Sequence, residues 1–152
     1  MLKKSTRFNK KKALLIIGCF ALLFLLGILA KGLVGSRSKP DLNTAEGRTA
    51  YLRSYGWEAD VKSEAEKRIT FPSEFGDVMT EYCQLQKSQG FELEKYSGKE
   101  CMQYTYRLMN YTGGAKDVFI TIYVYKGNVI AGDIHTLSSD GFMHGFISQP
   151  RL

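Results

Sequence analysis

The sequence predicts an α+β protein in which an N-terminal transmembrane helix precedes two helices packed on a mainly antiparallel sheet of about five strands. Three observations predict this arrangement. Residues 13–30 form an apolar run without a charged side chain. Two later segments place apolar residues at helical spacing, and several others alternate apolar and polar residues with the period of a strand. From Asp41 onward about 110 residues remain, which is enough for one compact core.

The apolar run is long enough to cross a bilayer. Its 18 residues make a helix about 27 Å long, against a hydrocarbon thickness of ~30 Å. Beyond Lys31, three more apolar residues extend it. The lipid bilayer is therefore the first expected partner. The predicted organisation is a cytoplasmic basic N-terminus (1–12), a transmembrane signal anchor (13–34), a linker (35–43) and an extracytoplasmic α+β domain (44–152).

The flanking charges predict the orientation of this helix. Six basic residues precede it and only three lie between it and residue 40, which favours a cytoplasmic N-terminus and places the domain outside the cell membrane. A cleaved signal peptide is the alternative, but the run is long and Ile28–Ala30 is a poor cleavage site. Cys19 follows a lipobox-like sequence, yet the chain stays apolar after it, so a lipid-facing cysteine is the simpler interpretation.

The charges are distributed unevenly along the chain. The sequence holds 21 Lys and Arg against 15 Asp and Glu, but residues 1–40 carry nine of the cations and no acid. The remaining 12 cations and 15 acids give residues 41–152 a net charge of −3. A nucleic-acid partner is therefore not expected, because the basic balance belongs to the anchor and not to the domain.

The first half of the domain begins with a short helix. Asn43 with Glu46 three residues later resembles a capping box, and Gly56 is placed to end the helix. Residues 57–61 and 68–71 alternate and predict two strands. Ser73 is expected to cap a second helix ending at Gly90, with an apolar stripe of Phe75, Val78, Met79, Tyr82, Leu85 and Gln86.

Three strands are expected in the second half, over residues 102–108, 118–124 and 129–135. A three-residue turn at 126–128, with Asn128 left-handed, would pair Val124 with Ile130 and Ile120 with Ile134. Both helices are expected on one face of the sheet. The opposite face then carries the polar and aromatic residues Gln103, Thr105, Arg107, Phe119, Thr121, Tyr123, Tyr125, Asp133 and His135.

This polar and aromatic face is the expected binding surface for a ligand or an envelope protein partner. The alternative is that the C-terminal tail or the first helix covers it. The candidate binding residues are Arg107, Tyr123, Tyr125, Asp133 and His135.

Asp133, His135 and His144 supply the alternative hypothesis of a cell-envelope hydrolase or metal-dependent enzyme. Their spacing matches no established motif, so hydrogen bonds to the backbone are the simpler role, and no cofactor is expected. Cys83 and Cys101 are expected on opposed faces, which favours free thiols over a disulfide. The sequence has none of the common hydrolase, zinc or phosphate-loop motifs.

Several short motifs bear a family resemblance. They are Tyr55-Gly56-Trp57, Leu85-Gln86, Gln89-Gly90-Phe91, Tyr96-x-Gly98-Lys99, Tyr104-Thr105-Tyr106, Asn110-Tyr111, Gly132-Asp133 and Gly141-Phe142-Met143-His144-Gly145. Over residues 46–146 the chain resembles the Domain of Unknown Function 4830 family. The resemblance implies a small membrane-anchored protein of clostridia-like Gram-positive bacteria and implies no activity.

We therefore expect a non-enzymatic module of the cell envelope that binds a protein partner or ligand. A structural subunit of a membrane complex is a further alternative.

Overall fold

The computed structural model describes residues 39–112, 114–115, 117–138 and 141–147. The predicted anchor, residues 13–34, lies outside these residues. Within the described part of the chain, no helix is both long enough and apolar enough to span a bilayer.

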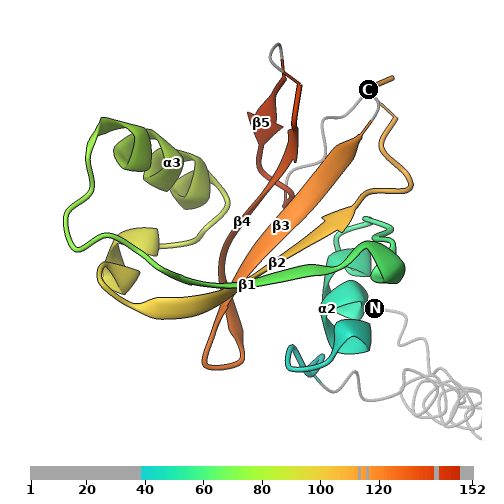
Figure 1. Cartoon of the computed structure of the whole chain (residues 1–152), viewed down its shortest axis with the longest axis horizontal. Helices are drawn as coiled ribbons and strands as arrows, with labels where there is room; N and C mark the ends of the chain where they lie inside the picture. The colour runs from blue at the N-terminus through green and yellow to red at the C-terminus, as the bar shows by residue number, and fades with distance from the viewer. Residues whose placement is uncertain (1–38, 113, 116, 139–140, 148–152) are drawn as a thin grey trace, which may run out of the picture. The chain divides into compact units, whose positions relative to one another are not determined.

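The centre of the domain is one antiparallel sheet of five strands, in which each strand pairs with the next along the chain (Figure 1). This confirms the predicted α+β class with a five-stranded antiparallel sheet. The strands are β1 (Ala65–Thr70), β2 (Glu100–Arg107), β3 (Val118–Tyr125), β4 (Asn128–Thr136) and β5 (Met143–His144).

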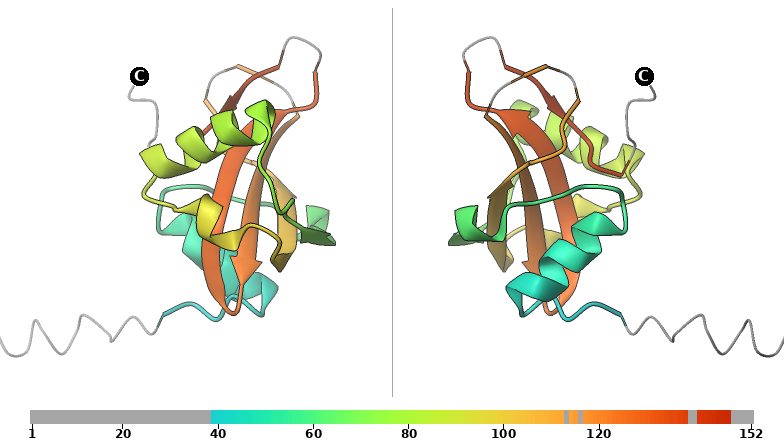
Figure 2. Two further views of the ribbon diagram at one scale, coloured as in Figure 1. Left: turned by 90° about the vertical axis from the view of Figure 1, so that its left-hand side faces the viewer. Right: turned by 90° about the vertical axis from the view of Figure 1, so that its right-hand side faces the viewer.

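The two helices, α2 (Ala45–Arg53) and α3 (Asp77–Ser88), pack on opposite faces of the sheet. Leu52 of α2 shares a buried cluster with Tyr106 and Ile120, whereas Cys83 of α3 shares another with Ala131. The two views of Figure 2 show α3 in front of the sheet in one and α2 in front in the other. The prediction that both helices cover one face is wrong, because β2 to β4 bury side chains on both faces.

The first helix begins one residue later than predicted and buries an unexpected cation. Thr44 caps it by accepting a hydrogen bond from the N–H of Gly47, and Gly56 follows its end with a φ of 89°. Arg48 is buried. Its guanidinium donates to Glu64 at 2.8 Å and to the hydroxyl of Tyr106 at 2.8 Å.

Residues 57–61 do not form the predicted strand. They make a single bridge, between Ala59 and Leu108, and lead into a 3₁₀ turn, η1 (Val61–Ser63). Trp57 is buried instead in the cluster that surrounds Leu52 of α2, which we call the α2 core. There its indole N–H donates to the carbonyl of Phe146 at 2.6 Å. The fifth strand is β5, which the sequence pattern did not predict because it has only two residues.

The second helix begins at Asp77, four residues after the predicted cap. The chain between β1 and α3 is held by a second 3₁₀ segment, η2 (Leu93–Tyr96), and the turn after it. There the N–H of Gly98 donates to the carbonyls of Phe71 and Pro72, and the hydroxyl of Ser97 donates to the carbonyl of Ser73. These bonds keep Pro72 and Ser73 out of the helix, so Gly76 becomes the residue before it.

The turn between β3 and β4 has two residues, not three. Lys126 and Gly127 have φ values of 48° and 71°, and Tyr125 pairs with Asn128. Val124 therefore pairs with Val129 and not with Ile130, whereas Ile120 pairs with Ile134 as predicted. The register shifts after Tyr123, so a bulge absorbs one residue and returns Asp133 to the α3 face.

Two glutamines at the end of α3 form hydrogen bonds with β4, and one of them also binds the C-terminal segment. The side chain of Gln89 donates to the carbonyl of Gly132 and accepts from the N–H of Phe146. The oxygen of the Gln86 side chain accepts from the N–H of Gly132. A Cβ at Gly145 would lie 2.6 Å from the Gln89 side chain, which explains the second glycine of the Gly141–Gly145 motif.

Candidate functional site

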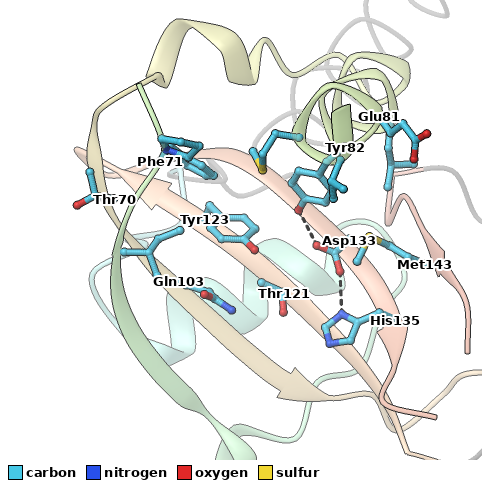
Figure 3. A pocket seen from close by; sticks show the side chains of 15 residues that line it. Thr70, Phe71, Glu81, Tyr82, Gln103, Thr121, Tyr123, Asp133, His135 and Met143 are labelled. Carbon is cyan, nitrogen blue, oxygen red and sulfur yellow. Dashed lines mark hydrogen bonds and ion pairs between the residues drawn. The ribbon is translucent and has the colours of Figure 1, made fainter. Parts of the chain in front are cut away.

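An open groove lies between α3 and the sheet face that this helix covers (Figure 3). Its volume is about 760 Å³, which is within the range of ligand pockets. The floor comes from β2, β3 and β4, and the walls come from α3, the end of β1 and β5. We call it the α3 groove and define it by its lining residues: Ile69, Thr70, Phe71, Pro72, Val78, Met79, Glu81, Tyr82, Leu85, Gln103, Thr121, Tyr123, Asp133, His135 and Met143.

A chain of hydrogen bonds crosses the groove from the helix to the sheet. The Tyr82 hydroxyl donates to Asp133 Oδ2 at 2.6 Å, and Asp133 Oδ1 lies 2.7 Å from Nδ1 of His135. Asp133 and His135 are two residues apart on β4, so both side chains leave the same face. Figure 3 shows both contacts. The chain joins α3 to β4 and orients the imidazole of His135.

The Asp133 contact determines which nitrogen of His135 is available. An ionised carboxylate only accepts, so we place the ring hydrogen on Nδ1, which leaves Nε2 as the acceptor of the neutral ring. Within the described residues Nε2 makes no hydrogen bond, and the side chain is 19% exposed against 3% for Asp133. A ring oriented in this way can accept a hydrogen bond from a ligand or take a proton from one.

The tyrosines around Asp133 are held in their neutral form. Burial, and then the negative charge of Asp133, raises the pKa of Tyr82 far above its usual range. The same two causes, in the same order, raise the pKa of Tyr123 to about 12. Both hydroxyls are therefore protonated at neutral pH. They can act as hydrogen-bond donors but carry no charge to attract a ligand.

The structure brings three of the five predicted binding residues into the groove, namely Tyr123, Asp133 and His135. The other two lie elsewhere. Arg107 pairs with Asp117 at 2.6 Å, with half of its side chain exposed. Tyr125 packs against the ring of Tyr96. Neither lines the α3 groove.

The sequence pattern did not identify Tyr82 and Val78 as groove residues, and it placed Gln103 on the expected binding face without including it among the candidate binding residues. The helical spacing assigned Tyr82 and Val78 to the core, yet Val78 is 81% exposed at the rim of the groove. The sequence did contain a sign of this second covered face. In β4, Ile130 and Ala131 are apolar on the α3 side and Ile134 is apolar on the α2 side. That pattern indicates a sheet covered on both sides.

His144 does not join Asp133 and His135. Opposed residues in a sheet share a face, and His144 pairs with Ile134 while His135 pairs with Met143. His144 therefore lies on the α2 side, where Nε2 is 3.1 Å from the hydroxyl of Tyr111. Across the described ranges, no three His, Cys, Asp or Glu side chains are grouped to hold a metal ion.

The cysteines of the domain are free thiols, and both are buried. The prediction that they lie on opposed faces is wrong, since Cys83 and Cys101 belong to the same buried cluster on the α3 side. Burial, with the charge of Glu100, raises the pKa of Cys101 to about 11. Burial, with the charge of Glu94, also raises the pKa of Cys83. Neither thiol is activated as a nucleophile.

The fold and the groove define a class: a small α+β protein with an antiparallel sheet, a helix on each face, and an open groove under one helix. The chain belongs to the family described as Domain of unknown function (DUF4830), whose model matches residues 51–134. The matched segment runs from α2 into β4 and includes Tyr82 and Asp133 of the groove. No curated protein and no solved structure matches the chain significantly.

Proposed function

We propose that this protein is a single-pass membrane protein whose extracytoplasmic domain binds a protein partner or ligand of the cell envelope in the α3 groove. The observation that carries the proposal is an open groove, mainly apolar, with His135 oriented on its floor by Asp133. Residues 13–34 and the basic N-terminus support the anchor and its orientation. The family resemblance supports a membrane-anchored protein of clostridia-like Gram-positive bacteria.

The composition of the groove favours binding. Ligand pockets are mostly apolar with a few placed polar groups, and this groove combines apolar walls with Gln103, Asp133 and His135. Two apolar side chains at its edge face solvent, Val78 with 81% and Met143 with 55% of their surface exposed. Exposed apolar groups beside a groove are typical of interaction sites.

In-cell crosslinking of the tagged full-length chain, followed by mass spectrometry, tests the proposal. We compare the wild type with Val78→Lys, which places a positive charge at the groove, and with Met109→Lys, which changes a residue that is 64% exposed outside it. The proposal expects a reproducible partner or ligand adduct that falls roughly tenfold in Val78→Lys only. Equal retention by all three chains would contradict binding in the groove.

A hydrolase of the cell envelope is the second candidate function. It is favoured by the 2.7 Å contact between Asp133 and Nδ1 of His135 and by the open Nε2, which is the arrangement of a general base. His144 has no part in it, because it lies on the other face. The test is release of soluble fragments from purified cell-wall material: His135→Gln should abolish this release, whereas Met109→Lys should retain it. No release by the wild type would contradict this function.

A further inference from the structure

The fixed charges that line the α3 groove are all negative. Of its lining residues only Glu81 and Asp133 are acidic, and none is Lys or Arg. The segment that builds the helical wall, residues 69–86, adds the exposed acids Glu74 and Asp77; the basic residues that flank it, Arg68 and Lys87, do not line the groove, and Arg68 is paired with Glu100. None of the acids in this segment forms an ion pair within the described chain. The groove therefore attracts cations.

The apolar walls of the groove favour a cationic ligand that also carries an apolar group. Phe71, Met79 and Leu85 line the walls between the polar floor and the rim. Burying a Leu-sized or Phe-sized side chain there removes apolar surface from water and so favours binding. A purely ionic ligand would leave this surface in contact with water.

Two polar groups on the floor have hydrogen-bonding capacity to spare. The amide of Gln103 makes no hydrogen bond within the described residues, and Nε2 of His135 is an open acceptor. A primary amide offers one acceptor and two donors, so it matches a peptide unit, which has one of each. A hydrocarbon chain would bury these groups without partners, and an acidic segment would face Glu81 and Asp133.

We propose that the occupant of the α3 groove is a basic polypeptide segment, in which Lys or Arg alternates with apolar side chains. This inference rests on the proposed function and names the partner of the same site. The apolar side chains lie between α3 and the sheet, the basic side chain faces Glu81, and the backbone pairs with Gln103 and His135.

Fluorescence anisotropy with short labelled peptides tests the inference. The full-length chain is held in phosphatidylcholine nanodiscs, with empty nanodiscs as the blank. The probes are Gly-Lys-Leu-Lys-Leu-Gly, its counterpart with Glu in place of Lys, and its counterpart with Ser in place of Leu. The variants are Glu81→Lys and, as matched control, Glu58→Lys, an exposed acid that does not line the groove.

We expect the Lys-Leu peptide to bind saturably and roughly tenfold more tightly than either counterpart. Glu81→Lys should weaken this binding roughly fivefold or more, and Glu58→Lys should leave it unchanged. Equal binding of the Glu-Leu or Lys-Ser peptide, equal loss in both variants, or no binding of any peptide would each overturn the inference. If the loss of crosslinking in Val78→Lys is observed in such a case, the groove still binds a partner and only the proposed class of partner is wrong. If that result fails too, the proposed function fails with it.

Discussion

The residues that define the groove owe their positions to strand alternation. The period of two places Tyr123, Asp133 and His135 on one face of the sheet, and this much follows from the sequence alone. The partner of Asp133 does not follow from it, because Tyr82 lies 51 residues away on a helix whose position depends on tertiary packing. The same limit applies to Arg48, whose burial depends on Glu64.

Replacing Tyr82 by Phe should destabilise the domain. The substitution keeps the ring and removes the hydrogen bond to Asp133, whose carboxylate stays buried. A hydrogen bond to a charged group contributes about 1.5–3 kcal/mol, so we expect a loss of that size in the free energy of unfolding. Denaturant unfolding of the full-length chain measures it. Tyr125→Phe removes a hydroxyl that has no hydrogen bond in the described part of the chain, and it should change stability by less than about 0.5 kcal/mol. Equal effects of the two substitutions would contradict the role of Tyr82.

At the scale of elements, the strands could be predicted better than the helices' positions. The antiparallel order and the pairing of Ile120 with Ile134 follow from alternation, because a register slip would bury Asp133 in the α2 core. The apolar residues on both faces of β4 indicate that both faces of the sheet are covered, but no local pattern shows which helix covers which face. The sequence did not predict the bulge in β4, because inward and outward side chains still alternate in the residues before the bulge and in those after it.

Arg48 joins α2 to its neighbours, so its loss should weaken the attachment of that helix. The guanidinium contacts the carbonyl of Leu42, the carboxylate of Glu64 and the hydroxyl of Tyr106. Arg48→Ala leaves Glu64 without its cation, and we expect the free energy of unfolding to fall by about 3 kcal/mol. Arg53→Ala, an exposed cation of the same helix, is the control and should have little effect. A double Arg48→Ala/Glu64→Ala variant that loses the full sum of the single effects would show that the two residues are not coupled.

At the scale of the whole molecule, the raised pKa values of a buried thiol and a buried tyrosine hydroxyl predict that the free energy of unfolding falls at alkaline pH. The pKa of Cys101 is raised from 9.0 to about 11 and that of Tyr123 from 10.0 to about 12. Because the folded state holds these protons more tightly, their contribution is complete below pH 9. It is lost as pH rises towards 12, since the unfolded chain ionises first. Unfolding free energies measured across this window should fall, and Tyr123→Phe should reduce the slope between pH 10 and 12. A flat profile would contradict the burial of these groups.

The most direct test of the α3 groove as the binding site is site-specific photocrosslinking in living cells. A photoreactive amino acid replaces Val78 at the rim of the groove or, in the control chain, Met109 outside it; both positions are exposed. Neither substitution disturbs the core, so both chains should fold. We predict a light-dependent adduct of defined mass from position 78 and none from position 109. No adduct at position 78, or the same adducts at both positions, would contradict the assignment of the groove as the functional site.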